Sequence, residues 1–389
     1  MPLQQSLPAG SALGVMGGGQ LGRMFVHAAQ AQGFRVTVLE PDADSPAAAA
    51  ADQHLRAAYL DDSALQALAQ QCAAVTTEFE NVPAQALQQL ARSVWVSPPA
   101  SAVRVCQHRA LEKALFEQAG VPCAPHALLR TQADLHSPEL ASLLPGILKT
   151  ASLGYDGKGQ RSVGGLQDLA AAFEALGSVP CVLEHKLPLE HEISVIVARS
   201  HDGQIVNLPV QQNLHRDGIL ALTQVPPPDV APELSDRAVQ MAHQLVLALD
   251  YVGVLCVEFF VLSDGRLVAN EMAPRPHNSG HHSIDACDLS QFDLQLRTLV
   301  RWPLVQPRQH SAAVMLNLLG DLWWDGSGSQ REPPWSEVVA LPGSHLHLYG
   351  KSEPRRGRKM GHLSFTAATM SQAQACARQA AALLGLAPW

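Results

Sequence analysis

Residues 146–160 read Gly-Ile-Leu-Lys-Thr-Ala-Ser-Leu-Gly-Tyr-Asp-Gly-Lys-Gly-Gln, a short apolar strand that runs into a glycine-rich loop. The loop holds three glycines within six residues: Gly154, Gly157 and Gly159. Glycine lets consecutive backbone N–H groups turn toward one anion, and Lys149 and Lys158 add positive charge. No Ser or Thr follows the lysine, so the spacing is not that of a P-loop. Taken alone, the stretch fits either a phosphate-binding loop or an exposed surface hairpin.

The composition indicates a globular protein with more than one domain. The chain has 389 residues, of which 47% are hydrophobic and 16% are charged, and this length predicts two or three domains. No apolar run reaches the length of a membrane span, and the first ten residues lack the features of a signal peptide. We therefore expect a cytoplasmic protein without a membrane partner. The net charge of −8 argues against general nucleic-acid binding, so an anionic ligand requires a local cluster of cations.

The cysteines predict neither a disulfide framework nor a zinc site. They lie at positions 72, 106, 123, 181, 256, 287 and 376. Seven is an odd number, and none of the spacings is C-x-x-C, so reduced thiols are expected.

The N-terminal part opens with a βαβ pattern. A strand, a helix and a second strand are expected, in this order, at residues 13–16, 21–32 and 35–40. Residues 17–22 match G-x-G-x-x-G between the first strand and the helix, and Glu40 lies near the distance expected for a ribose contact. A dinucleotide site is one interpretation. The other is a helix N-terminus that holds a different phosphate or a small polar ligand.

The α/β alternation continues and predicts a parallel sheet wrapped by helices. Further helices are expected at residues 61–72 and 84–91, and further strands at residues 75–77 and 94–96. Glu78 and Glu80 follow the third expected strand, at the edge where such sheets bind ligands, so they fit either a ligand contact or a solvated turn. Residues 97–120 read as one helical segment, on which Arg104 and Lys113 fit solvated charges.

Residues 252–272 read as a long hairpin that turns at Ser-Asp-Gly. If Leu262 pairs with Leu267, Glu258 lies directly opposite Glu271. Two like charges on one buried face repel each other. Mg²⁺ between them would remove the repulsion, since this ion favours one or two carboxylates together with phosphate oxygens. The alternative is a hairpin face that lies in solvent and holds no ion.

Two polar segments follow the hairpin. The first is a dense set of hydrogen-bond donors that suits a small oxyanion: Arg275, His277, Asn278 and Ser279. The second is a run of five basic residues: Lys351, Arg355, Arg356, Arg358 and Lys359. Such a run fits either a solvated basic turn or a site for a nucleotide monophosphate, because Arg binds phosphate oxygens in pairs.

These motifs together resemble the ATP-grasp superfamily. The resemblance rests on Lys149, residues 154–160, Glu184, Glu192, Glu258 and Asn270-Glu271. In that superfamily the lysine and the glycine loop close over the phosphates of ATP, acidic strand-end residues hold adenine and ribose, and paired carboxylates hold Mg²⁺. Within the superfamily, residues 17–22, 270–281 and 349–362 are similar to the family of 5-(carboxyamino)imidazole ribonucleotide synthases, and this likeness covers nearly the whole chain.

The resemblance implies roles for individual residues. The implied nucleotide contacts are Arg104, Lys149, Gly154, Tyr155, Asp156, Gly157, Lys158, Gly159, Gln160, Glu184, His185, Lys186, Leu187, Glu192, His215 and Asn270. The implied contacts of aminoimidazole ribonucleotide are Gln20, Leu21, Glu78, Tyr155, Asp156, Asn278, Ser279, Lys351 and Arg358. Glu258 and Glu271 would hold Mg²⁺. Arg275 and His277 would serve bicarbonate, and Lys149 would stabilise the phosphoryl charge.

The fold implied by the resemblance is an α/β protein of ATP-grasp architecture. An N-terminal parallel α/β substrate domain (1–125) would precede an ATP-grasp domain (126–295) with an α+β lid at about 126–195, and a small C-terminal α+β domain (296–389) would follow. The implied activity is the ATP-dependent carboxylation of aminoimidazole ribonucleotide by bicarbonate, through carboxyphosphate, in purine biosynthesis. A homodimer is expected.

Three other functions stay open. A formate-using transformylase of glycinamide ribonucleotide is also an ATP-grasp enzyme, but residues 349–362 and the Arg275-Pro-His277 motif speak against it. An NAD-dependent oxidoreductase would explain residues 17–22 and Glu40 but leaves the central and C-terminal motifs without a role. A non-enzymatic nucleotide-binding module would not need paired carboxylates beside an Arg-His loop.

Overall fold

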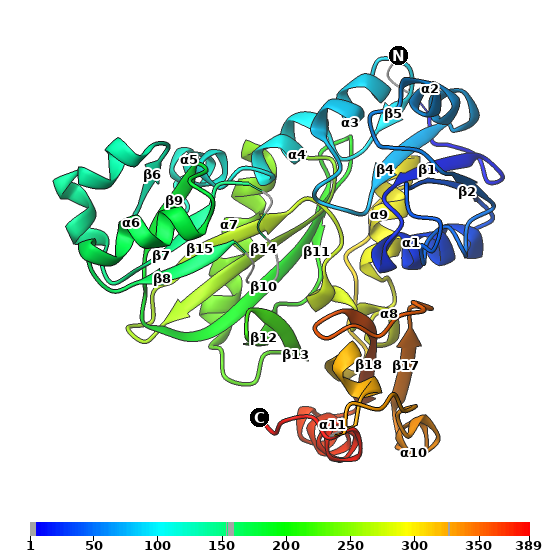
Figure 1. The fold of residues 1–389 in the computed structure, drawn as a ribbon. Helices are drawn as coiled ribbons and strands as arrows, with labels where there is room; N and C mark the ends of the chain where they lie inside the picture. Colours follow the sequence, from blue (N-terminus) through cyan, green and yellow to red (C-terminus); the bar gives the residue numbers. More distant parts are fainter. Residues whose placement is uncertain (1–4, 153, 155–158, 326) are drawn as a thin grey trace.

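The computed structural model describes residues 5–152, 154, 159–325 and 327–389. The strands in these ranges form a five-stranded, a four-stranded and a nine-stranded sheet. In Figure 1 the five-stranded N-terminal sheet lies on the right, the four-stranded sheet on the left and the long central strands between them. The mixed α/β architecture expected from the sequence is confirmed.

The N-terminal strands form a parallel sheet in the order β3-β2-β1-β4-β5. The strands are β1 (Ala12–Met16), β2 (Arg35–Leu39), β3 (Gln53–Leu55), β4 (Ala74–Thr77) and β5 (Trp95–Val96), and the helices are α1 (Gln20–Ala31), α2 (Asp62–Gln71) and α3 (Ala84–Leu90). Asp61 accepts a hydrogen bond from the Ala64 N–H and so begins α2, as its sequence predicts. The edge strand β3 was not predicted, because three partly exposed residues carry no usable periodicity.

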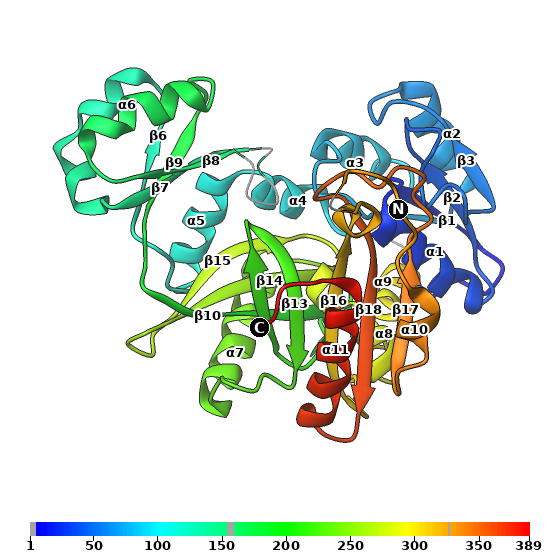
Figure 2. The ribbon, with the colours of Figure 1, turned by 60° about the horizontal axis from the view of Figure 1, so that its bottom comes forward.

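A four-stranded antiparallel sheet, one α-helix and two short 3-10 helices (Gln132–His136 and Pro138–Leu143) form a separate small unit, which we call the lid module (residues 126–185). Its strands run in the order β6-β9-β7-β8. Its elements are β6 (His126–Leu129), β7 (Gly146–Thr150), β8 (Gln160–Val163), α6 (Leu166–Ala175) and β9 (Cys181–His185). Leu148, Leu169 and Phe173 are buried in a core of the module's own. Figure 2 shows the module standing apart from the N-terminal sheet, on the other side of the central strands.

The nine-stranded sheet runs in the order β15-β14-β10-β12-β13-β16-β18-β17, with β11 paired to β10. The strands are β10 (Leu189–Arg199), β11 (Ile205–Asn207), β12 (Gln211–Arg216), β13 (Ile219–Val225), β14 (Gly253–Leu262), β15 (Leu267–Ala273), β16 (Ala312–Leu319), β17 (Ser344–Leu348) and β18 (Lys359–Ala367). Because β16 pairs with β13, the C-terminal strands continue the central sheet and do not form a sheet of their own.

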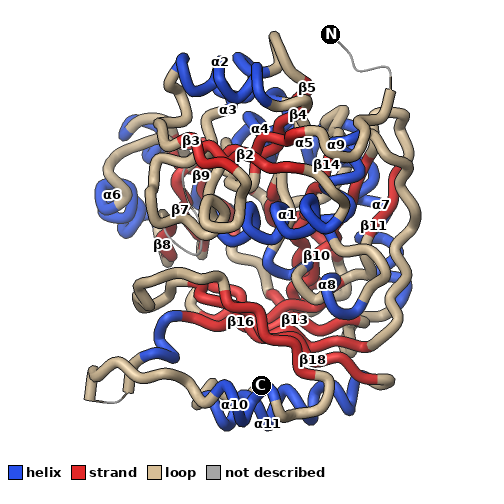
Figure 3. The backbone as a smooth tube through the Cα atoms, turned by 90° about the vertical axis from the view of Figure 1, so that its right-hand side faces the viewer, coloured by secondary structure: helices blue, strands red, loops and turns tan. Residues whose placement is uncertain are grey.

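The remaining helices cover this sheet or join it to its neighbours. They are α4 (Ala100–Cys106), α5 (Arg109–Gln118), α7 (Pro232–Ala248), α8 (Ser283–Ala286), α9 (Gln291–Val300), α10 (Trp335–Val339) and α11 (Met370–Leu384). Figure 3 shows α10 and α11 on the outer side of β16 and β18. The single helix predicted for residues 97–120 is two helices, because the backbone of His108 is extended and starts α5 afresh. None of the helices in the described ranges is both long enough and apolar enough to cross a membrane.

Helix α9 follows the central hairpin in sequence but packs into the N-terminal core. Phe292, Leu296 and Leu299 are buried there with Leu13 of β1 and Phe25 of α1. Leu294 on the same helix is buried with Ile196 of β10 and Val254 of β14, so α9 joins the five-stranded sheet to the nine-stranded sheet by shared apolar burial.

We predict that Phe292→Ala lowers the free energy of unfolding by about 3–5 kcal/mol, because it leaves a cavity at this junction. Leu247→Ala, on an exposed position of α7, should change it by less than about 0.5 kcal/mol. Urea unfolding of both variants checks the prediction. A loss below about 1 kcal/mol for Phe292→Ala would show that the junction tolerates the cavity.

Candidate active site

A cleft of about 710 Å³ lies where the three parts of the chain meet. The N-terminal part lines it with residues 18–21 and 78–81, the central hairpin with Glu258 and Glu271, and the C-terminal part with residues 355–359. Predicted site residues from all three parts of the sequence therefore face one space.

Glu258 on β14 lies opposite Glu271 on β15, as predicted, but by a different route. Leu267 pairs with Val261 and not with Leu262, and a β-bulge at Asn270 then restores the predicted register. Burial and, next, the charge of Glu271 raise the pKa of Glu258. Burial acts the same way on Glu271, but Arg109 and Lys149 outweigh it and lower the pKa of that carboxyl.

The oxygen atoms around this pair fit Mg²⁺. The two carboxylates face each other, and the buried Oδ1 of Asn270 has no hydrogen-bond partner among the described residues. Hard oxygen donors on one or two carboxylates, with room for phosphate oxygens, are what this ion prefers.

Arg109 lines the cleft, whereas Arg104, an implied nucleotide contact, does not. Arg104 is exposed at the end of α4 and does not line the cleft. Arg109, in the first turn of α5, lines the cleft, and its Nη1 lies 3.1 Å from Oε2 of Glu271. Arg104 and Arg109 lie on different helices, because the helical segment breaks between α4 and α5. The sides of the two helices that face the cleft are therefore set separately. A prediction of a new helix that begins at Arg109 would have indicated its position in the cleft.

Lys113 was expected to be a solvated charge, but it is buried. Its side chain is 0% exposed, and its Nζ donates to the Asn270 carbonyl at 2.9 Å and lies 3.5 Å from Glu184 Oε1. The other carboxylate oxygen of Glu184 accepts from Lys149 at 2.9 Å. Burial alone would raise the pKa of Glu184, but Lys149 and Lys113 lower it to about 2. Glu184 thus forms buried ion pairs with both Lys149 and Lys113.

The glycine-rich loop is only partly described. Gly159 has φ +73°, and a Cβ there would come within 2.7 Å of the Thr150 hydroxyl, so glycine is required. Gly154 lines the cleft, while Gln160 is exposed at the start of β8. The other loop residues predicted to contact ligands lie outside the described residues: Tyr155, Asp156, Gly157 and Lys158. The segment predicted for adenine follows β9, with His185 and Leu187 half-buried and Lys186 exposed.

The carboxylate of Glu78 occupies the N-terminus of α1, where the pyrophosphate of a dinucleotide would bind. It accepts hydrogen bonds from the N–H groups of Gly19 at 2.7 Å and Gly22 at 3.1 Å, at the N-terminus of α1. Glu40, proposed as a ribose contact, instead accepts a hydrogen bond from Tyr59 at 2.6 Å. The G-x-G-x-x-G segment therefore binds an internal carboxylate, and Glu78 is a buried cap, not a residue of a solvated turn.

Two predicted ribonucleotide contacts from opposite ends of the chain meet directly. The Nζ of Lys351 donates to Gln20 Oε1 at 2.8 Å. Leu21 and Arg358 line the same cleft, as do the other basic residues of the run. Four of the five cations lie on the loop between β17 and β18 and Lys359 is the first residue of β18, and all five line the cleft.

The donors that follow the hairpin are held by carboxylates and by one another. Arg275 forms an ion pair with Glu80, which sequence analysis left open as a solvated turn residue. The Nε2 of His277 lies 3.3 Å from Glu258 Oε1, and its Nδ1 lies 2.9 Å from the hydroxyl of Ser279. Burial and, next, Arg275 lower the pKa of His277 well below its usual value, so the ring is neutral.

Ser279 and Asn278 differ in what they face. Ser279 is fully buried, and its hydroxyl is hydrogen-bonded to Ser194 Oγ and His277 Nδ1, so it supports the His277 ring. Asn278 lines the cleft, and both polar atoms of its side chain are buried without a hydrogen-bond partner among the described residues. A polar ligand would satisfy them.

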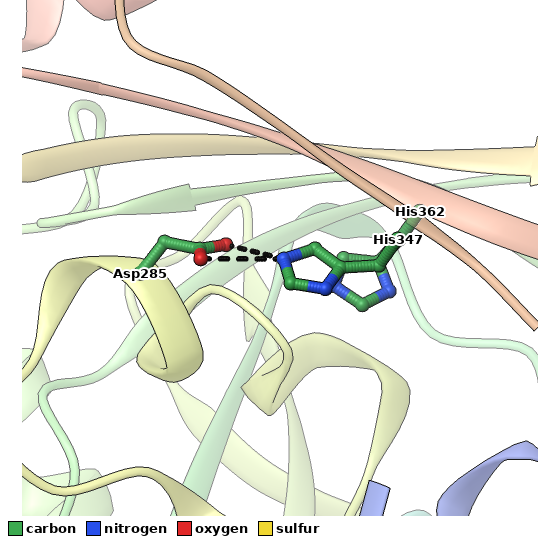
Figure 4. A group of neighbouring side chains, drawn as sticks. All are labelled: Asp285, His347 and His362. Atoms are coloured by element: carbon green, nitrogen blue, oxygen red, sulfur yellow. Dashed lines mark hydrogen bonds and ion pairs between the residues drawn. The ribbon is translucent and has the colours of Figure 1, made fainter. Parts of the chain in front are cut away.

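A second polar cluster joins α8 to the β17–β18 hairpin (Figure 4). Asp285, His347 and His362 bring potential metal-ligating atoms within 4.8 Å of one another. However, His347 Nε2 is hydrogen-bonded to Asp285 Oδ2 at 2.9 Å, and His362 Nδ1 to the Tyr349 hydroxyl at 3.0 Å. The rings of His347 and His362 stack within 13° of parallel, so their nitrogen lone pairs lie in parallel planes and do not converge. The cluster is a hydrogen-bonded stack that fixes the hairpin.

His215 and Glu192, both predicted nucleotide contacts, form an ion pair between β12 and β10. Burial would lower the pKa of His215, but the hydrogen bond to Glu192 and the charge of Glu258 raise it to about 8 from an ordinary value of 6.5. Folding therefore favours the protonated ring.

This pair predicts a stability that falls with rising pH. Its contribution, at most about 2 kcal/mol, is complete below about pH 6.5 and is lost as the pH rises through about 8. The free energy of unfolding of the wild type, minus that of His215→Gln, should fall by this amount between pH 6 and 9 in Mg²⁺-free buffer. A difference that does not change with pH would contradict the prediction.

Three known domain families match almost the whole chain. Residues 11–107 match the ribonucleotide synthetase preATP-grasp domain, residues 114–292 the ATP-grasp domain, and residues 313–376 the phosphoribosylaminoimidazole carboxylase C-terminal domain. The N5-carboxyaminoimidazole ribonucleotide synthase of Brucella melitensis biotype 1 is 42% identical over 361 residues, 92% of this chain and 97% of the relative.

Solved structures agree with this match. An N5-carboxyaminoimidazole ribonucleotide synthetase in complex with ADP superposes with a TM-score of 0.90 at 38% identity, over 97% of this chain and 98% of that one. The Aspergillus clavatus enzyme in complex with ADP and 5-aminoimidazole ribonucleotide gives 0.86 at 32% identity, over 97% and 99%. The cleft, its opposed carboxylates and its basic run thus occur in a chain that belongs to the ATP-grasp family of N5-carboxyaminoimidazole ribonucleotide synthases.

Proposed function

We propose that the protein carboxylates 5-aminoimidazole ribonucleotide with bicarbonate and ATP, forming N5-carboxyaminoimidazole ribonucleotide, ADP and phosphate in purine biosynthesis. One observation carries the proposal: a single cleft joins the opposed carboxylates Glu258 and Glu271 to the basic run at 351–359. The first feature suits the Mg²⁺ of bound ATP, and the second suits the phosphate of a ribonucleotide. The Aspergillus clavatus complex with ADP and the same ribonucleotide supports this pairing of ligands.

The residues that would hold Mg²⁺ are Glu258 and Glu271, with the free Oδ1 of Asn270 beside them. When bound, the ion would neutralise charge on the phosphates of ATP. Arg109 lies next to Glu271 and adds a fixed positive charge at the same place. Lys149 stands at the end of β7, where the glycine-rich loop begins, and is set by Glu184.

The first step is a phosphoryl transfer. An oxygen of bicarbonate attacks the γ-phosphorus, the bond to the bridging oxygen of ADP breaks, and carboxyphosphate forms. Arg275, held by Glu80, would place the negative charges, and the neutral ring of His277 would donate or accept a hydrogen bond. Positioning and charge stabilisation are the main contributions that such a transfer needs from a protein.

The second step forms a C–N bond. The exocyclic amine of the ribonucleotide attacks the carboxyl carbon, the C–O bond to phosphate breaks, and the departing phosphate takes the proton of the amine. Carboxyphosphate reacts with water, so the lid module would have to close before it forms.

The ribonucleotide would lie toward the C-terminal loop. Lys351 and Gln20, already hydrogen-bonded to each other, and Arg358 face this end of the cleft. The amide of Asn278, which lacks a hydrogen-bond partner among the described residues, lines the same cleft and would contact the reacting groups. The expected homodimer, the cytoplasmic location and the domain boundaries at 125 and 295 stay predictions.

Phosphate release separates this function from its nearest rival. We expect release from ATP with aminoimidazole ribonucleotide and bicarbonate to exceed the ATP-only background by at least about a hundredfold, and glycinamide ribonucleotide with formate to stay at background. Release that does not exceed background with the first pair would falsify the proposal.

Arg109 and Arg104 give a matched pair of variants for the ATP end of the cleft. Arg109→Ala removes a charged group beside Glu271, so the KM for MgATP should rise about tenfold to a hundredfold. Arg104→Ala, on the exposed end of α4, should leave it within about twofold of the wild type. Steady-state kinetics at saturating ribonucleotide check both values. Equal effects of the two substitutions on the KM for MgATP would contradict the assignment of this contact to Arg109 rather than Arg104.

A further inference from the structure

The opposition of Glu258 and Glu271 depends on one inserted residue. Phe259 pairs with Ala269, and if this register continued, Glu258 would face Asn270. Glu271 would then pair with Val257 and its side chain would change to the opposite face of the hairpin, because side chains alternate along a strand. The bulge at Asn270 prevents this and puts both carboxylates on the cleft face.

Helix α5 holds the bulge from the side. The Nζ of Lys113 donates to the Asn270 carbonyl at 2.9 Å, and Oε1 of Glu112 accepts from the Met272 N–H at 2.5 Å. These two hydrogen bonds bracket Glu271 along β15. Arg109, one turn earlier on the same face of α5, binds the Glu271 carboxylate itself at 3.1 Å.

Glu112 and Lys113 are buried ionisable residues to which the proposed reaction assigns no step. Burial is the main cause that raises the pKa of Glu112 to about 8. Glu112 is 2% exposed and Lys113 is 0% exposed. Burying ionisable side chains is costly unless their hydrogen bonds are made, so their place here needs a reason. We propose that Glu112 and Lys113 are positioning residues that fix the bulge at Asn270 and thereby keep Glu271 opposite Glu258 for Mg²⁺. The inference rests on the proposed function of that carboxylate pair.

The same lysine also reaches the lid module. Its Nζ lies 3.5 Å from Glu184 Oε1, while Lys149 of β7 binds Glu184 Oε2. One buried ammonium thus contacts both the bulge beside the carboxylate pair and Glu184 on β9, the strand that pairs with β7 in the lid module. The positions of the metal site and of the lid strands are set by a shared group.

The test uses four variants of the full-length chain. Lys113→Met and Glu112→Leu remove the two hydrogen bonds, whereas Glu112→Gln keeps an oxygen that can accept from the Met272 N–H. Glu117→Leu, on an exposed position of the same helix, is the matched control. Binding of Mn²⁺ in the presence of ADP is measured from the electron paramagnetic resonance of the free ion, and thermal unfolding is followed in parallel.

We expect Lys113→Met and Glu112→Leu to raise the Kd for Mn²⁺ by about tenfold or more, as loss of a group that orients a metal ligand does. Glu112→Gln should stay within about threefold of the wild type, and Glu117→Leu should match it. If Lys113→Met does not fold, the contrast between Glu112→Leu and Glu112→Gln decides.

The outcomes are distinguishable. A lowered Tm with an unchanged Kd for Mn²⁺ in both Lys113→Met and Glu112→Leu would show that these residues only stabilise the fold, and would overturn the inference. If the wild type itself binds no Mn²⁺ in the presence of ADP, it is the proposed metal site that fails. Mn²⁺ binding in the wild type that the two substitutions weaken supports both.

Discussion

The structure depends on two carboxylates that face each other across a β-hairpin. Glu258 and Glu271 repel each other, and nothing in an isolated hairpin would hold them together. A one-residue bulge sets their register, and Arg109 of α5 offsets the charge of Glu271. The arrangement is stable because the protein supplies part of the positive charge itself and leaves the cleft side open for a cation and phosphates.

The same principle of local compensation holds throughout the cleft. The chain carries a net charge of −8, yet each buried carboxylate near the site has its own partner. Glu78 accepts hydrogen bonds at the N-terminus of α1, Glu80 pairs with Arg275, and Glu184 lies between two lysines. Groups that are paired in this way are held in place, which is what positioning of small anionic substrates requires. Among the described residues, the Oδ1 of Asn270 and the amide of Asn278 are buried without a hydrogen-bond partner, and Asn278 lines the cleft.

Three parts of the chain reach one cleft because packing crosses their boundaries. Helix α9 brings the end of the central part into the N-terminal core, and β16 continues the central sheet into the C-terminal part. The hydrogen-bonded stack of Asp285, His347 and His362 then fixes the β17–β18 hairpin against α8. The loop of this hairpin carries the basic run, so Lys351 meets Gln20 although 331 residues separate them.

The sequence by itself determined the α/β class, most of the strands and helices and the face shared by Glu258 and Glu271, because local periodicity and turn residues carry this information. The family followed from the resemblance of its motifs to those of known enzymes. The sequence did not determine the sheet continuity of β13 and β16, the hydrogen bonds of Glu78, the burial of Lys113 or the position of Arg109 in the cleft. These features arise where one element meets another that is distant in sequence. A carboxylate or a cation has the same residue letter in solvent, in an ion pair or at a helix N-terminus, and only the tertiary contacts decide which of these environments it occupies.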